Sequence, residues 1–144
     1  MTKLEDFLKL NKDRHICTIS KDQSVRQALI LMSENNIGAI IIVDNNDFPI
    51  GIFSERDYAR KIILKGKSSK DTLLDEVMTK ELITVTKDHK TDQCMEIMVE
   101  KRIRHLPVLE NKKIIGIISI GDLLKITIKD QKELINQLQK FITT

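Results

Sequence analysis

The sequence contains 144 residues, of which 41% are hydrophobic and 31% are charged, and its formal net charge is +3. This length and balance are typical of one globular domain, or of two small units that share a core. The charge excess is too small to indicate nucleic-acid binding by itself, and an aromatic content of 3% argues against surfaces that stack bases.

The first part of the chain predicts a helical arm, residues 1–11, and then a β-α-β-β-α unit, residues 12–64. The apolar residues of the arm recur at helical spacing and are Leu4, Phe7 and Leu8. Three runs rich in apolar and β-branched residues predict strands at 16–20, 37–43 and 50–53. Ser24 precedes a helix whose apolar face consists of Val25, Ala28, Leu29 and Met32. Ser54 begins a second helix that ends near Leu64.

A linker at residues 65–74 leads to a second copy of this unit, residues 75–126. Thr18-Ile-Ser-Lys-Asp22 aligns with Thr84-Val-Thr-Lys-Asp88, and Ile50-Gly-Ile-Phe-Ser54 aligns with Ile115-Gly-Ile-Ile-Ser119. The second unit predicts strands at 84–86, 105–109 and 114–119, and a helix whose apolar face consists of Thr91, Cys94, Met95 and Met98. A further helix begins at Gly121. We therefore expect an α/β fold of the α+β kind, in which two β-α-β-β-α repeats pack about a pseudo-twofold axis.

A C-terminal helix, residues 127–144, is predicted after the second repeat. It carries its own apolar stripe, which consists of Leu134, Leu138 and Phe141. Two interpretations of the terminal stripes stay open. Both stripes cover the core of the repeats, or one of them contributes to a dimer.

Each repeat carries a Ser-x-x-Asp sequence where a strand gives way to a helix: Ser54 with Asp57, and Ser119 with Asp122. This is capping-box spacing, so one interpretation is that these residues satisfy free backbone N–H groups at the start of each helix. The second interpretation adds a ligand. A carboxylate accepts hydrogen bonds from both hydroxyls of a ribose, and a serine with free helix N–H groups suits a phosphate. A capping residue can also contact a ligand.

Arg104 and His105 precede a buried strand and are a second candidate pair. They are either an exposed edge residue and a core histidine, or a phosphate contact in which the guanidinium offers its donor fork. Their equivalents in the first repeat are Gly38 and Ala39, and Arg56 is replaced by Gly121. The two candidate sites are therefore chemically unequal. Arg56 beside Asp57, extended by Arg60 and Lys61, favours the Asp57 site for phosphorylated ligands, unless Arg56 is only a solvated helix residue.

The remaining chemistry predicts neither an enzyme nor a metal site. Cys17 and Cys94 form no paired motif, and a cysteine on an apolar helix face is an inert core residue. The sequence has no catalytic Ser/His/Asp order, no phosphate-binding glycine loop and no paired-carboxylate motif. It begins without a secretory signal and lacks an apolar run of bilayer length, so we expect a cytoplasmic location and no membrane insertion.

These motifs together resemble the cystathionine-β-synthase (CBS) domain, present as a tandem pair. The segments that carry the resemblance are Gly51-Ile-Phe-Ser54-Glu-Arg-Asp57, Val77-Met78-Thr79, Arg104-His105-Leu-Pro107-Val108 and Gly116-Ile-Ile-Ser119-Ile-Gly-Asp122. The resemblance covers residues 12–126 and is strongest to small stand-alone pairs. It implies a regulatory module that binds AMP, ADP, ATP, NAD(H) or S-adenosylmethionine in clefts between the repeats. It also implies disc-like homodimers and a regulated partner protein.

The resemblance also implies which residues contact the adenine. Cys17 and Ile37 line its slot on the Asp122 side, where Gly38 permits close backbone approach. Thr79, Ile83 and Ile103 line the slot on the Asp57 side. Ordinary core packing accounts equally for the aliphatic residues. Two other functions stay open: a structural or interaction protein with vestigial clefts, and a single-stranded nucleic-acid binder that uses the lysine-rich surface.

Overall fold

The computed structural model describes residues 2–143, so the outermost residue of each predicted terminal arm lies outside the described residues. The chain divides into two compact units. The first-repeat unit comprises His15–Ile83 with Asn111–Ile114. The second-repeat unit comprises Met1–Arg14, Thr84–Glu110 and Ile115–Thr144, so the N-terminal arm joins the second repeat.

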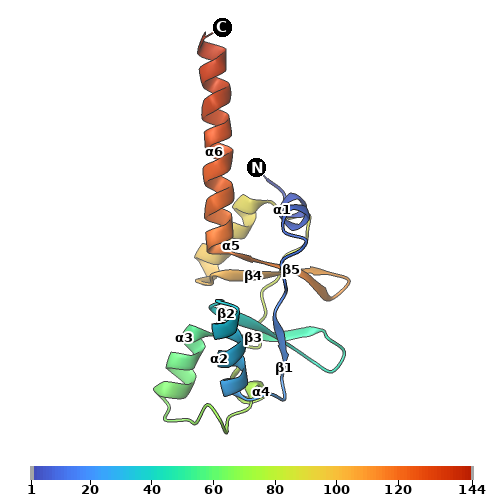
Figure 1. The fold of residues 1–144 in the computed structure, drawn as a ribbon, viewed down its shortest axis with the longest axis vertical. Coiled ribbons are helices and arrows are strands. Elements are labelled where there is room, and N and C mark those ends of the chain that lie inside the picture. The colour runs from blue at the N-terminus through green and yellow to red at the C-terminus, as the bar shows by residue number, and fades with distance from the viewer. Residues whose placement is uncertain (1, 144) are drawn as a thin grey trace. The chain divides into compact units, whose positions relative to one another are not determined.

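The first-repeat unit is built on a mixed three-stranded sheet in the order β1-β2-β3 (Figure 1). Its elements are β1 Thr18–Ser20, α2 Val25–Glu34, β2 Ala39–Val43, β3 Pro49–Ser54, α3 Glu55–Asp57, a π-helical turn Tyr58–Ile63, and α4 Leu74–Val77. α2 connects the parallel pair β1 and β2, whereas β3 returns antiparallel to β2. All five residues of β2 are buried, as a central strand with an apolar, β-branched sequence requires.

Backbone hydrogen bonds and buried side chains fix the first helix of this unit as predicted. The Ser24 hydroxyl accepts a hydrogen bond from the backbone N–H of Gln27 at 3.2 Å, which caps α2. Val25, Ala28 and Met32 are buried and pack in the core cluster with Phe53. The expected second helix, in contrast, widens after Asp57 into the π-helical turn.

The second-repeat unit contains three helices, α1 Leu4–Leu10, α5 Thr91–Lys101 and α6 Ile120–Thr143, and most of a two-stranded sheet. The strands are β4 His105–Glu110 and β5 Lys113–Ser119, of which Lys113 and Ile114 are assigned to the first-repeat unit. The strand expected at residues 84–86 is reduced to one parallel bridge between Val85 and Val108. Pro107 explains this difference, because it has no N–H group to extend the ladder toward Ile83. On the C-terminal side of Val85, the carbonyl of Lys87 accepts a hydrogen bond from the N–H of Glu5 in the N-terminal arm.

The two terminal apolar stripes have opposite outcomes. In α1, Leu4 and Phe7 are buried, and Leu8 lies so close to Gly116 that a β-carbon there would overlap its side chain. The covering interpretation is therefore right for the arm. In α6 the predicted stripe, Leu134, Leu138 and Phe141, is 55%, 52% and 82% exposed, so it does not cover the core.

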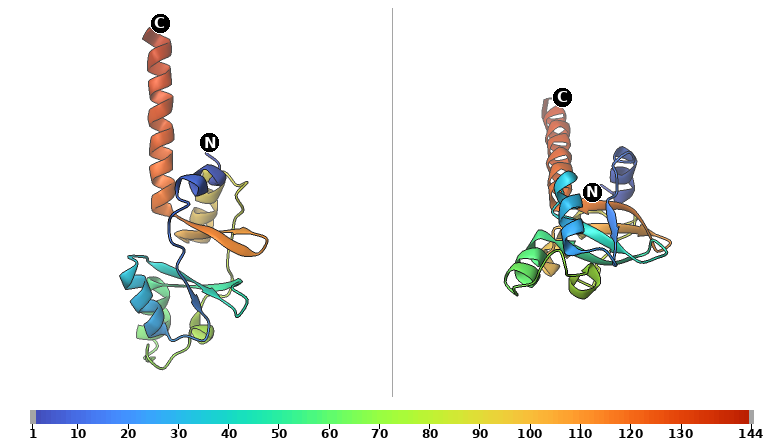
Figure 2. Two further views of the ribbon diagram at one scale, coloured as in Figure 1. Left: turned by 45° about the vertical axis from the view of Figure 1, so that its right-hand side comes forward. Right: turned by 60° about the horizontal axis from the view of Figure 1, so that its bottom comes forward.

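The C-terminal helix is not a separate element, because α6 runs without a break from the second capping box to Thr143. Figures 1 and 2 show that only its first part lies beside α5. Within residues 2–143, no helix is both long enough and apolar enough to cross a membrane.

Candidate functional site

Both Ser-x-x-Asp sequences form complete capping boxes at the junction of a strand and a helix. Between β3 and α3, the backbone N–H of Asp57 donates to Ser54 Oγ at 3.1 Å, and that of Ser54 donates to Asp57 Oδ2 at 3.0 Å. Between β5 and α6, the corresponding distances for Ser119 and Asp122 are 3.1 and 2.9 Å. The capping interpretation is confirmed. In each box one backbone N–H orients the carboxylate, which retains other lone pairs for further donors.

Within the first-repeat unit, Thr79 lies against Asp57. The Thr79 hydroxyl is 3.3 and 3.4 Å from the two carboxylate oxygens, and Lys61 Nζ is 3.4 Å from Oδ1. Lys61 is held in place by the carbonyl of Val77 at 2.9 Å and by the Thr79 hydroxyl at 3.0 Å. The Asp57 side chain is 17% exposed, so this cluster is partly buried but open to solvent.

A glycine in β3 explains how Thr79 reaches this position. Thr79 pairs with Ile52 through two backbone hydrogen bonds of 2.9 and 3.0 Å. This approach passes over Gly51, where a β-carbon would lie 2.7 Å from the Met78 sulfur and 3.0 Å from the Thr79 carbonyl oxygen. Such contacts are too short for any larger residue without a shift, so Gly51 permits residues 78 and 79 to dock on the strand.

Within the second-repeat unit, Arg14 forms a bidentate ion pair with the Asp122 carboxylate. Its two terminal nitrogens donate to Oδ2 at 3.0 Å and to Oδ1 at 3.3 Å. The guanidinium also donates to Asn11 Oδ1 at 3.1 Å and lies 5.3 Å from the centre of the Phe7 ring. Burial alone would raise the pKa of Asp122. Hydrogen bonds from Arg14 and Ser119, with the positive charge of Arg14, nevertheless lower the pKa below its ordinary value of 3.8.

Arg14 was not predicted from the sequence. Phe7, Asn11 and Arg14 are four and three residues apart, and this spacing would place them on one helix face. From that spacing, contacts of Arg14 with Asn11 and Phe7 could have been predicted. Nothing in the sequence, however, pairs the arm with the second repeat rather than with the repeat that follows it.

The other candidate residues of the first-repeat unit have mixed surroundings. Cys17 is buried in the core, 3.8 Å from the Asn35 side-chain amide, and burial raises the pKa of its thiol. Ile83 is half-buried. Arg56 is exposed in α3. Ile37 and Gly38 follow α2 and line an open groove with Leu29, Met32, Ser33, Asn36 and Glu55.

In the second-repeat unit, Ile103 and His105 are half-buried and Arg104 is exposed at the start of β4. The Arg104 carbonyl accepts a hydrogen bond from Ile120 N–H at 2.9 Å, which places it beside the Ser119–Asp122 capping box. The Gly38 carbonyl accepts from Glu55 N–H at 3.0 Å in the same way. The predicted equivalence of Gly38 and Arg104 therefore corresponds to an equivalent backbone contact.

Two further predictions concern cysteine and metal chemistry. Cys94 is fully buried, and its pKa is raised to about 11 by burial and by the charge of Asp92, as for an unreactive core thiol. Among residues 2–143, no group of three or more His, Cys, Asp or Glu side chains is placed to hold a metal ion.

Two copies of one repeat unit, each with a Ser-x-x-Asp capping box after its last strand, define a tandem-repeat protein; in the second copy the first strand is reduced to the Val85–Val108 bridge. The CBS domain family model matches residues 9–64 and 74–129, and the chain belongs to that family. The predicted repeats, 12–64 and 75–126, lie inside the matched ranges.

Three known proteins illustrate the relationship. The chain is 40% identical over 125 residues to the CBS domain-containing protein CBSX3, mitochondrial, of Arabidopsis thaliana. The matched segment covers 84% of this chain but only 61% of that protein. A putative signal-transduction protein with CBS domains from Burkholderia ambifaria superposes with a TM-score of 0.84 at 47% identity, over 90% of this chain and 96% of that one. The CBS domain pair of protein MJ0100, solved with 5′-methylthioadenosine and S-adenosyl-L-methionine, shares the fold at 23% identity and a TM-score of 0.78, over 90% and 98% of the two chains.

Proposed function

We propose that this chain is a non-catalytic regulatory module that binds an adenosyl ligand, with AMP, ADP, ATP and NAD(H) as the candidates. The observation that carries the proposal is the pair of carboxylates, Asp57 and Asp122, each oriented by the backbone at a strand-to-helix junction. Ribose hydroxyls are donors that suit such carboxylates. Support also comes from MJ0100, a family member solved with two adenosyl compounds.

In the first-repeat unit, Asp57 binds the ribose. Thr79 and Lys61 already surround this carboxylate, so its charge is partly balanced while oxygen lone pairs stay available. Lys61 and the neighbouring Arg56 supply positive charge for a phosphate. Thr79 and Ile83 contribute to the adenine slot of this site.

In the second-repeat unit, Asp122 binds a ribose only in competition with Arg14. The bidentate ion pair must open or shift before two hydroxyls can reach the carboxylate oxygens. Asp57 faces a weaker competitor, because Lys61 makes its shortest hydrogen bond to the Val77 carbonyl rather than to the carboxylate. Asp57 is therefore the tighter site.

A thermal-shift panel tests the function. A ligand at 100 times its dissociation constant adds about 2.7 kcal/mol to the free energy of unfolding, which raises the melting temperature by several degrees. We expect AMP, ATP, NADH or S-adenosylmethionine to do this and GTP or UTP to do less. An unchanged curve with all four adenosyl compounds at millimolar concentration contradicts the proposal and supports an interaction protein with vestigial clefts.

The contribution of Arg104 is tested on the same ligands. Its exposed guanidinium, which forms no ion pair within residues 2–143, is the proposed phosphate donor, and His105 is the proposed neighbour. Arg104→Ala should weaken binding of AMP about tenfold in calorimetry and leave adenosine almost unchanged, because adenosine has no phosphate. Equal losses for both ligands would show that Arg104 has only a structural role.

A further inference from the structure

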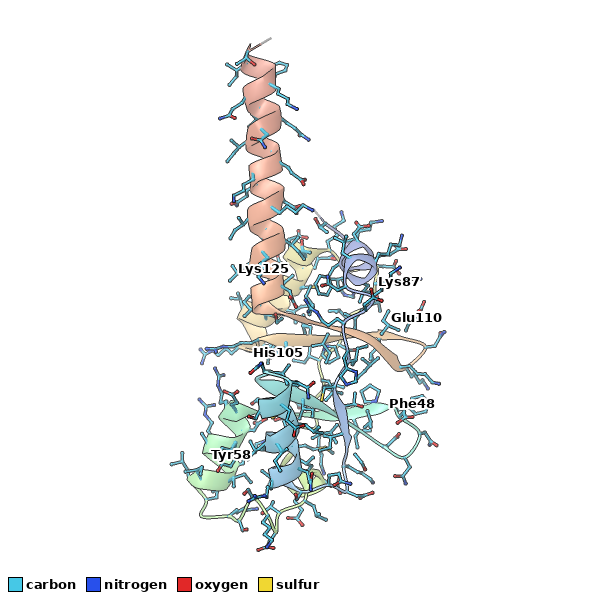
Figure 3. All side chains as sticks on the ribbon, in the orientation of Figure 1. Phe48, Tyr58, Lys87, His105, Glu110 and Lys125 are labelled. Atoms are coloured by element: carbon cyan, nitrogen blue, oxygen red, sulfur yellow. The ribbon has the colours of Figure 1, made fainter. Side chains whose placement is uncertain are left out.

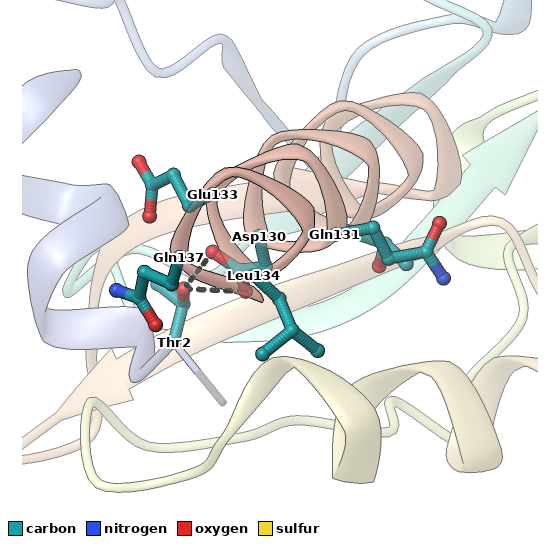
Figure 4. Close-up of a pocket in the computed structure, with 7 residues that line it drawn as sticks. Thr2, Asp130, Gln131, Glu133, Leu134 and Gln137 are labelled. Carbon is teal, nitrogen blue, oxygen red and sulfur yellow. Dashed lines mark hydrogen bonds between the residues drawn. The ribbon is translucent and has the colours of Figure 1, made fainter. Parts of the chain in front are cut away.

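The long helix α6 has two apolar faces, and only one is used within the chain. The first face contains Leu123, which is fully buried, and ends at Asp130, whose carboxylate accepts hydrogen bonds from the Thr2 hydroxyl at 2.8 and 3.0 Å (Figure 4). Beyond Asp130 every described residue of α6 is exposed. Figure 3 shows these side chains projecting around the helix with no other element beside them.

The second face runs the length of the helix, including the part that packs on α5. Its residues are spaced alternately by four and three, and we name them the α6 seam: Leu124, Ile128, Gln131, Ile135, Leu138 and Ile142. The five apolar members are 50%, 51%, 53%, 52% and 79% exposed, in that order. This is the a/d spacing of a two-stranded coiled coil, continued for more than two heptads.

The second half of α6 exposes apolar side chains and lacks tertiary packing, and a partner helix would supply both burial and packing. From Gln131 onward, α6 has about four helical turns with no buried side chain, and isolated helices of that length are marginal in water. The apolar seam side chains would gain burial against a second seam of the same spacing, and the helix would gain the tertiary packing that it lacks.

The one polar residue of the seam, Gln131, indicates which helix pairs with α6 and in which direction. Gln131 occupies a d position, and its side chain forms no hydrogen bond within the described part of the chain; Figure 4 shows it on the opposite side of α6 from Glu133. In a parallel, in-register pair of identical helices, each Gln131 amide faces its own copy and the two can bond to each other. In an antiparallel pair centred on the same segment, Gln131 instead faces Ile135, and its amide stays unsatisfied.

The charges that flank the seam favour the same arrangement. Lys125 and Lys132 occupy e positions, which lie beside g positions of the partner in a parallel pair. The g positions are Thr127, Leu134 and Phe141, so no like charges meet. An antiparallel pair would bring Lys132 beside its own copy. We propose that two copies of this chain associate through the α6 seam as a parallel, in-register coiled coil, independently of any ligand.

Analytical ultracentrifugation of the full chain tests whether the α6 seam is a dimer interface. We expect a dimer at about 100 µM without ligand, and at least tenfold weaker self-association for Ile135→Asp, because a seam residue is replaced by a charge. Asn136→Asp is the matched control, since it adds the same charge one residue away, off the seam, and should remain dimeric. Both positions are exposed, so circular dichroism should show unchanged melting of the repeats. A monomeric wild type, or self-association of Ile135→Asp as strong as that of the wild type, overturns the proposal.

Cysteine crosslinking tests the direction of the helices. In the parallel pair, Leu124→Cys and Ile142→Cys each oxidise to a disulfide-linked dimer with themselves. In an antiparallel pair these positions meet only each other, because they lie about 27 Å apart along one helix, so only a mixture of the two variants crosslinks. Glu133→Cys, on the opposite side of α6, should not crosslink. Crosslinking only in the mixture, or in none of the samples, overturns the parallel pairing.

Discussion

Asp57 and Asp122 stand at equivalent junctions and receive the same pair of capping hydrogen bonds, yet their cationic neighbours come from different parts of the chain. Lys61 lies one helical turn after Asp57, and Thr79 comes from the first residues of the second matched range, 74–129. Arg14 comes from the N-terminal arm and is separated from Asp122 by 108 residues. The repeat therefore fixes how each carboxylate points, whereas residues that the two repeats do not share decide how much of its charge is already paired.

The largest expected effect separates the two carboxylates. Asp57→Ala removes charge-assisted hydrogen bonds to the ribose, each worth about 1.5–3 kcal/mol, so the tighter site should lose roughly tenfold to hundredfold in affinity. Asp122→Ala should affect mainly the weaker site. Calorimetry with the ligand found in the thermal-shift panel measures both.

A conservative variant controls for damage to the capping box. Asn at position 57 keeps an oxygen that accepts from Ser54 N–H, so Asp57→Asn should retain most of the helix cap while it loses ribose affinity. If Asp122→Ala removes the tighter site and Asp57→Ala leaves it intact, the proposed ranking is reversed.

The next largest effect is expected from alanine substitution of Gly51, compared with its equivalent in the second repeat, Gly116. A β-carbon at Gly51 meets the Met78 sulfur and the backbone of Thr79, whereas at Gly116 it meets only the end of the Leu8 side chain. Gly51→Ala should therefore cost about 1–3 kcal/mol of unfolding free energy and weaken the Asp57 site, because Thr79 must move. Gly116→Ala should leave ligand binding unchanged, since a leucine tip can rotate. Denaturant unfolding and calorimetry of both variants make the comparison, and equal binding losses would contradict it.

Local sequence predicts the parts of these sites that local contacts build. The Ser-x-x-Asp spacing was sufficient to predict both capping boxes, and helical spacing placed Val25, Ala28 and Met32 in the core. The resemblance to the CBS domain placed Thr79 beside Asp57. The shortened strand at Val85 could not be predicted from β-branched content, because its length depends on Pro107 in another strand. The Arg14 contact depends on packing of the arm, which periodicity does not specify.

Removing Arg14 should sharpen the comparison by making the two carboxylates more alike. In Arg14→Gln the Asp122 carboxylate loses its bidentate partner, so a ribose no longer competes with a guanidinium. The weaker site should then bind adenosine severalfold more tightly, while the Asp57 site is unchanged. If Arg14 instead contacts the ligand phosphate, AMP binding at the weaker site will fall while adenosine binding still rises. A fall for both ligands would contradict competition.

The smallest expected effect is a pH dependence that belongs to Asp122. Because the folded pKa of Asp122 is lowered, the ion pair with Arg14 contributes stability above the ordinary pKa of 3.8, and this contribution is lost as the pH falls through the lowered folded value. Arg14 is 48% exposed, so solvent screens the pair and we expect a contribution of about 0.5–1 kcal/mol near pH 7. Urea unfolding of the wild type and Arg14→Gln should differ by that amount near neutral pH and converge in acid, once the pH has fallen below the lowered folded pKa of Asp122. A difference that stays constant down to that pH would mean that Arg14 stabilises the arm through Phe7 and Asn11 rather than through the carboxylate.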